Sequence, residues 1–403
     1  MRLYAAGSNS EGQLGVGHTD DMASWTPCEQ DDGCAFPPPG WDIQACVCTS
    51  SATWALCTHA DASARSLYVC GRTAHATYRA FTRVPCKAIG IDAGPDDAQV
   101  TMLAASWDCV YIVVRGPEAD DIYAYGGSAW GEAGPAHEPG AYATRIPLQI
   151  ETVAYTSTPL SCESLAQASV RIRAVQAGVR HVVLHVVWES TASHAIVCHG
   201  ILGWGHARHG QLGPPPPPSS RGMYTRPIAV CLWPPTKSDT TVYLAAGMQH
   251  TVLAWATPAH TELWALGQAR DGQLALPFPR SDVCPAWAHR FDVDGPAMPL
   301  CQWKTTFVWA GAALHACGRA SHEQTSGTSL SMAHAQAMAA GSEHCLVRTA
   351  SGDVYGWGWN EHGNLAHSPD AAALAPRRVW DHRADAGRAQ RMWAGNGTSF
   401  LVV

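Results

Sequence analysis

Hydrophobic and polar positions along this chain follow a repeated pattern. Each copy consists of a short apolar run, a glycine, a polar turn, and then Gly-Gln-Leu or Gly-Asn-Leu. Four copies are clear: LYAAGSNSEGQLGVG from Leu3, ILGWGHARHGQLG from Ile201, LWALGQARDGQLAL from Leu263 and VYGWGWNEHGNLAH from Val354. A unit that recurs over the whole length predicts a repeat architecture in which each apolar run is a strand of one repeated sheet.

The glycine that ends each apolar run counts the repeats. The clear copies place it at Gly7, Gly205, Gly267 and Gly358. Weaker copies, LYVCGR, IYAYGG and LHACGR, place it at Gly71, Gly126 and Gly318. The first pattern therefore predicts seven repeated units.

A second pattern, Ala-Gly-x-x-His followed by alternating apolar residues, is typical of a strand. Clear copies lie at 174–186, 244–255, 338–348 and 392–403, and degenerate copies at 45–57, 103–114 and 300–310. Seven copies of each pattern predict an all-β fold, a single seven-bladed β-propeller over residues 1–403. Residues 130–165 and 208–224 are longer than the repeat pattern requires, and we expect surface insertions there.

The order of the two patterns predicts how the ends of the chain meet. The chain starts with the first pattern and finishes with the second, so the strand within Met392–Val403 has only Leu3–Gly7 left as a partner. Pairing of the N- and C-terminal strands would close the ring of blades and leave no open sheet edge.

Residues that recur in register are expected to be structural. The repeated glycine allows close approach of a neighbouring backbone, because a Cβ atom would clash. His181, His250 and His344 occupy one repeat position, so we expect them to make structural hydrogen bonds and to bind no metal. His206 and His209 lie in a repeat turn and are expected to face solvent.

No motif in the sequence predicts catalysis. The glycines within 12–17 resemble a phosphate loop, but no helical pattern follows them. The four cysteines within 28–48 lack the paired spacing of a zinc site. The sequence shows no nucleophile elbow and no His-Glu-x-x-His. We therefore expect no enzyme activity, no catalytic residue, no cofactor and no metal.

Composition narrows the classes of partner and the compartment. The 403 residues carry a net charge of -7 and no run of Lys or Arg, which argues against direct binding of nucleic acid. The start lacks the apolar segment of a secretory signal, and no apolar stretch reaches transmembrane length. We expect a cytoplasmic protein, with the nucleus as a further location, no membrane association, and reduced cysteines.

A run of five prolines, Pro214 to Pro218, predicts a stiff polyproline II segment. Two interpretations stay open. The run could dock to a domain with an aromatic groove, or it could be a variable loop between strands. The shorter run FPPPG at 36–40 has the same two interpretations.

The Gly-Gln-Leu-Gly and Ala-Gly-x-x-His patterns resemble the regulator-of-chromosome-condensation repeat over essentially the whole chain. That resemblance implies a seven-bladed propeller, in a family that includes an exchange factor for the Ran GTPase, ubiquitin-ligase modules and scaffold proteins. The first and last copies, with SWDCVYIVV (106–114) and LCQWKTTFVW (300–309), are similar to a narrower group, the fungal alpha-tubulin suppressor family. The insertions at 130–165 and 208–224 depart from that group.

The narrower resemblance implies a non-enzymatic role and a partner. The partner would be a small zinc-binding, electron-carrying protein of diphthamide synthesis, linked indirectly to Elongator-dependent modification of wobble uridines in transfer RNA. The chain would then be a monomer by itself and a heterodimer with this partner. The alternatives are an exchange factor for a Ran-type GTPase, or a generic scaffold propeller.

Candidate partner-binding residues lie where the repeat consensus fails, because repeat positions are mostly structural. They are Asp20, Asp21 and Met22 after the first turn, Trp107, Asp108 and Trp303 in degenerate copies of the second pattern, and Trp359, Glu361 and His362 in the last turn. Buried aromatic residues are the usual anchors of a protein interface. The competing interpretation is packing between blades for the tryptophans and a solvated turn for the acids.

Overall fold

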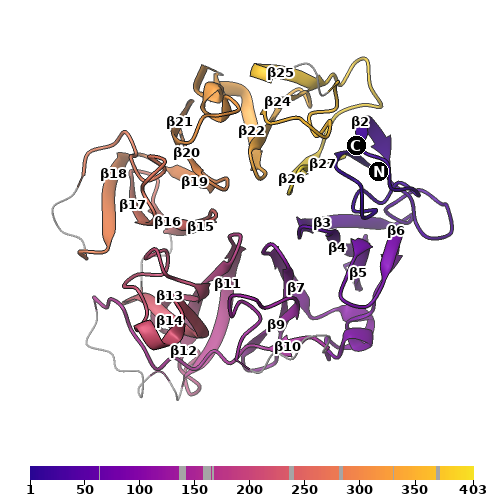
Figure 1. Cartoon of the computed structure of the whole chain (residues 1–403). Coiled ribbons are helices and arrows are strands. Elements are labelled where there is room, and N and C mark those ends of the chain that lie inside the picture. The colour runs from indigo at the N-terminus through magenta and orange to yellow at the C-terminus, as the bar shows by residue number, and fades with distance from the viewer. Residues whose placement is uncertain are drawn as a thin grey trace. The chain divides into compact units, whose positions relative to one another are not determined.

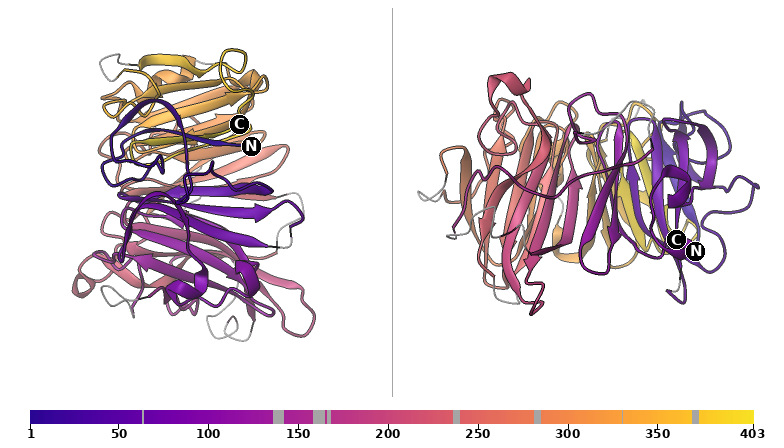
Figure 2. Two further views of the ribbon diagram at one scale, coloured as in Figure 1. Left: turned by 90° about the vertical axis from the view of Figure 1, so that its right-hand side faces the viewer. Right: turned by 90° about the horizontal axis from the view of Figure 1, so that it is seen from below.

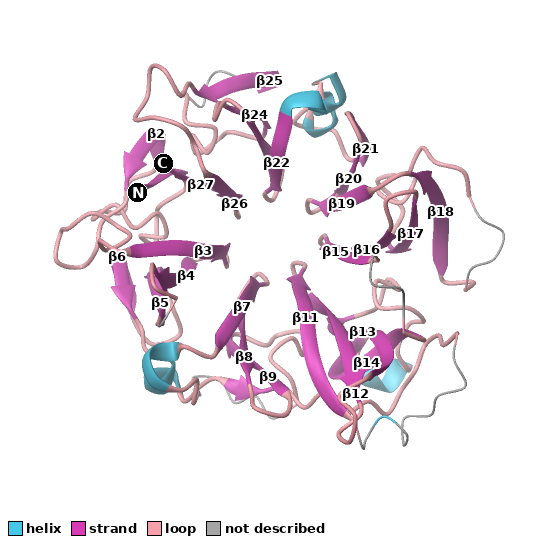
Figure 3. Ribbon diagram, turned by 180° about the vertical axis from the view of Figure 1, so that it is seen from behind, coloured by secondary structure: helices cyan, strands magenta, loops and turns pink. Residues whose placement is uncertain are grey.

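The computed structural model describes residues 1–62, 64–135, 142–157, 165, 168–235, 240–280, 285–329, 331–368 and 373–403. These residues form an all-β structure of seven small sheets. The 3-10 helices among them are short, and helices are drawn in cyan in Figure 3: η1 (Cys86–Ile89), η2 (Pro95–Asp97), η3 (Pro218–Ser220), η4 (Gln324–Ser329) and η5 (Met332–His334). No helix in the described ranges is long and apolar enough to cross a bilayer.

The chain divides into two compact units. The first unit comprises residues 1–98 and 312–403. Its strands are β1 (Leu3–Gly7), β2 (Met22–Pro27), β3 (Trp41–Cys48), β4 (Ala52–His59), β5 (Arg65–Arg72), β6 (Thr77–Arg83), β21 (Ala313–Gly318), β22 (Ala335–Ala340), β23 (His344–Thr349), β24 (Val354–Gly358), β25 (Ala373–Trp380), β26 (Arg391–Ala394) and β27 (Thr398–Val402).

The second unit comprises residues 99–311. Its strands are β7 (Val100–Ala105), β8 (Cys109–Arg115), β9 (Asp120–Gly126), β10 (Thr144–Arg145), β11 (Ser169–Ala177), β12 (His181–Glu189), β13 (Ile196–His206), β14 (Met223–Trp233), β15 (Thr241–Ala246), β16 (His250–Ala256), β17 (His260–Gly267), β18 (Ala288–Asp294), β19 (Ala297–Cys301) and β20 (Thr305–Ala310).

The sheets are antiparallel, and six of the seven pair their strands in chain order. These are β3-β4-β5-β6, β7-β8-β9-β10, β11-β12-β13-β14, β15-β16-β17-β18, β19-β20-β21 and β22-β23-β24-β25. The seventh has the order β2-β1-β27-β26. Seven small antiparallel sheets match the seven repeats of both sequence patterns. The predicted fold class, an all-β seven-bladed propeller, is confirmed.

The predicted pairing of the terminal strands is also confirmed. β1 and β27 pair antiparallel, with Leu3 opposite Val402 and Gly7 opposite Thr398. Arg2 N donates to Val403 O at 2.8 Å, and Val403 N donates to Arg2 O at 3.0 Å. Figures 1 and 2 show the two termini side by side. One sheet is therefore built from both ends of the chain.

The second strand of each sheet, which follows the Ala-Gly-x-x-His turn, is buried along almost its whole length. In β12 every residue from His181 to Trp188 is buried, and β27 is buried throughout. A strand that has neighbours on both edges and is covered on both faces has an almost continuous run of apolar residues in its sequence. The Ala-Gly-x-x-His pattern itself is a hairpin: its Ala-Gly ends the first strand or forms the turn, and its His starts the second.

The prediction of one domain over residues 1–403 stays a prediction, as do the two surface insertions. Within 130–165, residues 136–141 and 158–164 lie outside the described residues. The described part includes two parallel bridges to β14, Val153 to Ala229 and Thr156 to Leu232. The range 208–224 is fully described and contains η3.

Candidate functional site

The repeated glycine at the end of each third strand has a positive φ at all seven positions, from 90° at Gly71 to 132° at Gly126. A Cβ atom added at Gly267 would lie 2.3 Å from the carbonyl oxygen of Gln249, and one at Gly205 would lie 2.5 Å from that of Arg180. L-amino acids other than glycine rarely adopt this conformation. The glycine therefore belongs to the scaffold and offers no chemistry to a ligand.

The three repeat histidines each contact a hydroxyl on the second strand of the next sheet. The Nε2 atom of His181 lies 2.9 Å from Thr251 Oγ1, and that of His344 lies 3.0 Å from Ser399 Oγ. The corresponding contact of His250 is with Thr306. Burial lowers the pKa of His181 to about 3 and those of His250 and His344 to about 4, so all three are neutral near pH 7.

The glycine of Ala-Gly-x-x-His makes room for this imidazole. A Cβ atom at Gly247 would lie 2.2 Å from Cε1 of His250, and one at Gly341 would lie 2.4 Å from Cε1 of His344. The His344–Ser399 pair resembles the base and nucleophile of a hydrolase. However, both residues are completely buried and His344 Nδ1 has no hydrogen-bond partner, so no carboxylate orients the ring. The pair holds neighbouring sheets together.

The structure brings Trp107 and Trp303 together, although they lie far apart in the sequence. Their ring centroids are 5.5 Å apart, with 58° between the ring planes. Trp107 lies in the β7–β8 turn and Trp303 in the β19–β20 turn, and both are half-buried. Backbone bonds hold these turns: Trp107 N donates to Val179 O at 3.0 Å, and Met248 N to Trp303 O at 2.8 Å. We call Trp107 and Trp303 the tryptophan pair.

Asp108 is exposed next to Trp107. It lies near Glu132, a titratable residue that the sequence patterns did not identify. Glu132 is completely buried, and its Oε2 accepts a hydrogen bond from Trp130 N at 2.7 Å. Its Oε1 is buried with no hydrogen-bond partner. Burial, with a smaller contribution from nearby Asp108, raises the pKa of Glu132 to about 7, and hydrogen bonds from backbone N–H groups and the charge of Arg180 only partly oppose this rise. The Arg180 guanidinium lies 4.5 Å from the centre of the Trp130 ring.

Glu132 stands where other repeats have the glutamine of Gly-Gln-Leu. In those turns the glutamine Oε1 accepts from the backbone N–H two residues earlier, at 2.8 Å for Gln13 and 3.0 Å for Gln211. Glu132 makes the same bond but lacks the amide N–H₂ group. Gly-Glu-Ala in place of Gly-Gln-Leu was the sequence signal that could have identified this residue.

The remaining candidates gather in the first unit, around the first and last repeat turns. His362 Nδ1 lies 2.7 Å from Asp21 Oδ2, and Asp21 Oδ1 accepts a hydrogen bond from Asn9 N at 2.7 Å. The Trp359 ring meets the His362 ring edge-on, with centroids 5.3 Å apart. Asp20 and Glu361 are exposed, and Met22 is half-buried at the start of β2. We call Asp21, Trp359 and His362 the Asp21–His362 cluster.

The expectation that His206 faces solvent is wrong. His206 is buried, its Nδ1 lies 3.1 Å from Gln211 Nε2, and its ring lies 4.9 Å from that of Trp130. The reason is the repeat turn itself, which folds the Gln211 amide back onto the residue after the repeated glycine. His209 is half-buried.

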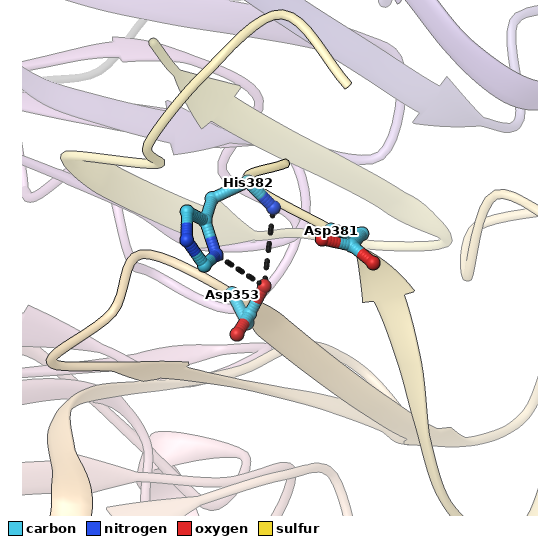
Figure 4. A group of neighbouring side chains, drawn as sticks. All are labelled: Asp353, Asp381 and His382. Carbon is cyan, nitrogen blue, oxygen red and sulfur yellow. Dashed lines mark hydrogen bonds and ion pairs between the residues drawn. The ribbon is translucent and has the colours of Figure 1, made fainter. Parts of the chain in front are cut away.

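A group of possible metal ligands, Asp353, Asp381 and His382, lies where β24 and β25 meet (Figure 4). Asp353 Oδ1 accepts from His382 N at 3.1 Å and lies 2.8 Å from His382 Nδ1, and Asp381 pairs with Arg378 at 3.0 Å. Burial alone would raise the pKa of Asp353, but hydrogen bonds from His382 and Ser351 outweigh it and lower the pKa to about 2. These contacts engage the ligand atoms and fix the ends of two strands.

Comparison with known proteins supports the repeat assignment. Sequence profiles of the regulator of chromosome condensation (RCC1) repeat match residues 336–364 and 351–402. The chain carries this repeat over residues 336–402. Its fold is similar to that of the crystal structure of human WBSCR16, with a TM-score of 0.62, 13% sequence identity and 100% of both chains covered.

The relatives that are similar in sequence include proteins of two kinds that match long stretches of this chain. The RCC1 domain-containing protein 1 of Homo sapiens is 28% identical over 258 residues, which is 62% of this chain and 61% of that protein. The mouse protein of the same name is 27% identical, and the match covers 52% of its length. The chain thus spans about half to three-fifths of these relatives. The secretion-regulating guanine nucleotide exchange factor of Bos taurus is 25% identical over 94% of this chain and 78% of that protein.

Proposed function

We propose that this chain is a non-enzymatic, protein-binding propeller. The observation that carries the proposal is the tryptophan pair: two half-buried rings that break the repeat consensus meet at 5.5 Å from separate sheets. Contacts that only hold neighbouring sheets together are made by the repeat residues, as the contact between His250 and Thr306 illustrates. Clustered aromatic side chains that keep some exposed surface are typical anchors of a protein interface.

We further propose that the partner is a small zinc-binding, electron-carrying protein of diphthamide synthesis, which would link the chain indirectly to Elongator. This identification rests on the resemblance of the first and last repeat turns to the fungal alpha-tubulin suppressor family. The Asp21–His362 cluster is built from those two turns. The complex would be a heterodimer, located in the cytoplasm and also in the nucleus.

A second candidate function is guanine-nucleotide exchange on a Ran-type GTPase. It is favoured by the 25% identity to the Bos taurus secretion-regulating guanine nucleotide exchange factor over 94% of the chain. The fold is compatible with both functions, because propellers with different partners share one scaffold.

Titration calorimetry with the purified zinc protein, and a nucleotide-release assay with a GDP-loaded Ran-type GTPase, separate the two candidates. Binding of the zinc protein should weaken about tenfold or more in a Trp107→Ala, Trp303→Ala double variant. A Trp309→Ala variant is the matched control, because Trp309 is half-buried near the opposite end of β20 from Trp303.

Equal binding by the double variant and the wild type would remove the tryptophan pair from the interface. Accelerated nucleotide release without binding of the zinc protein would establish the second candidate. If neither assay responds, both partner identities are wrong.

A further inference from the structure

The structure gives the conformation and the exposed faces of the proline run Pro214 to Pro218, which the sequence alone did not reveal. Each of Pro214 to Pro217 has its φ fixed by its own ring and its ψ restricted by the proline that follows. Pro217 has φ -54° and ψ 148°, which are polyproline II values. η3 begins at Pro218 and ends the extended segment.

Only one face of this segment packs against the protein. A polyproline II helix has three residues per turn, so residues i and i+3 share a face. Pro214 and Pro217 are exposed and share the first face, and Pro215 and Pro218 are exposed and share the second. Pro216, on the third face, is buried. The run therefore presents two parallel Pro-x-x-Pro ridges to solvent.

The segment is held in place at both ends. Tyr224 Oη donates to Pro214 O at 3.2 Å, and Ser220 Oγ donates to Pro217 O at 2.6 Å. Ala207 N donates to Gly222 O at 2.9 Å and closes the base of the loop. A ligand segment that is already ordered loses little conformational entropy when it binds.

Two cationic residues flank the prolines. Arg208 and Arg221 are exposed, and neither forms an ion pair with any residue in the described ranges. A Cβ atom at Gly222 would lie 3.0 Å from Cβ of Arg208, so the Arg208 stem lies against the base of the same loop. A partner groove bordered by carboxylates would complement this charge.

We propose that Pro214 to Pro218 with Arg221 forms a docking ligand for an SH3-type domain, whose aromatic groove takes the two ridges and whose acidic border takes the arginine. Recognition of Pro-x-x-Pro ridges by aromatic grooves uses the preformed extended helix and needs no hydrogen bonds within the ligand. This interaction is independent of the tryptophan pair and of the partner proposed above.

The second proline run supplies an internal contrast. In FPPPG at 36–40, Pro37 is buried and Pro38 is half-buried, so only Pro39 is exposed and no ridge of two exposed prolines forms. A Pro39→Ala variant is therefore a matched control for loss of a surface proline.

The experiment titrates the full chain into a set of purified, ¹⁵N-labelled SH3 domains with acidic groove borders, with WW domains as a comparison. At least one SH3 domain should bind at micromolar concentration, with chemical-shift changes in its aromatic groove. Pro214→Ala with Pro217→Ala, and separately Pro215→Ala with Pro218→Ala, should each weaken binding about tenfold or more. Arg221→Gln should weaken binding and reduce its dependence on salt.

Unchanged melting temperatures would show that the variants fold, as expected for exposed loop positions. The proposal is overturned if no SH3 domain binds the wild-type chain, if only WW domains bind, or if both ridge variants bind as tightly as the wild type. Weakening by Pro39→Ala to the same extent would also overturn it.

Discussion

The Nε2 atom of His250 lies 3.0 Å from Oγ1 of Thr306, so the first residue of β16 contacts the second residue of β20. Thr306 Oγ1 also donates to Gln273 O at 2.7 Å. Since the hydroxyl proton is used there, the imidazole N–H must donate to Thr306. The Thr306 hydroxyl thus bonds both to His250, on a strand of the neighbouring sheet, and to Gln273, in a repeat turn.

Replacing this hydroxyl should destabilise the chain. Thr306→Val keeps the side-chain shape but removes the hydroxyl that accepts from His250 Nε2 and donates to Gln273 O, which should cost about 2–3 kcal/mol. Thr306→Ser keeps the hydroxyl and should cost about 1 kcal/mol or less. Urea unfolding of the two variants gives the difference, and equal midpoints would contradict the proposed role.

Stability should fall as the pH drops below about 6.5. An unfolded histidine takes up a proton near pH 6.5, whereas burial lowers the folded pKa of His181 to about 3 and those of His250 and His344 to about 4. The unfolded chain therefore binds more protons, and each of these residues costs about 2 kcal/mol between pH 7.5 and 5.

Melting temperatures at pH 7.5, 6 and 5 test this pH dependence. A His250→Gln variant should show a shallower loss than the wild type. His334→Gln, at an exposed position, should leave the loss unchanged. If His250→Gln and the wild type have parallel pH profiles, His250 does not contribute to the acid sensitivity.

Glu132 should make the stability of the chain depend on pH in the opposite direction. Burial raises its folded pKa to about 7, above the value of an unfolded glutamate, so the folded chain binds more protons. Its contribution is therefore fully favourable below about pH 4.5 and is lost as the pH rises through 7. Glu132→Gln, which restores the repeat consensus, should raise stability by about 2 kcal/mol at pH 8 and little at pH 5.

Gln211→Glu is the reciprocal variant, because Gln211 is buried in the equivalent turn. It should destabilise the chain at pH 8 more than at pH 5. Thermal melts at both pH values suffice, and a Glu132→Gln effect that is independent of pH would rule out titration of this carboxyl.

The repeated glycine should tolerate no side chain. Gly267→Ala combines a φ of 107° with a contact of 2.3 Å to a carbonyl oxygen, so we expect a loss of about 3 kcal/mol or more, or failure to fold. Gly295 has a φ of 78° with no atom within 4 Å of an added Cβ. Gly295→Ala should therefore cost only about 1 kcal/mol. Similar unfolding midpoints would show that the carbonyl contact relaxes freely.

Deleting residues 392–403 should abolish cooperative unfolding. The deletion removes β27 and most of β26, and it leaves β1 with β2 as its only sheet partner. A two-stranded hairpin has little stability in water. Differential scanning calorimetry would detect the loss, and a cooperative transition near the temperature of the full chain would contradict it.

The repeat predicted the strands that carry glycine and histidine, because those residues meet the same backbone in every sheet. It did not predict the outermost strands, such as β14 and β25. These strands have no recurring residue, and they follow loops of different length. Their positions depend on pairing with the preceding strand.

The candidate site was predicted only in part. Trp107 and Trp303 were each identified because they break the consensus, but their contact depends on how the sheets lie in space, which no local pattern encodes. The contact between Asp21 and His362 is similar, since 341 positions separate them in the sequence. Glu132 and His206 were missed because turn positions are usually solvated, whereas this turn folds inward.

The pairing of β1 with β27 has a consequence for biosynthesis. β1 and β2 leave the ribosome long before β26 and β27, which are the other two strands of their sheet. At about 5–20 residues per second, the N-terminal strands wait about 20–80 s for these partners. During that time an apolar strand edge is exposed in the cell, so chaperone capture at residues 1–27 should be a normal step in the production of this protein.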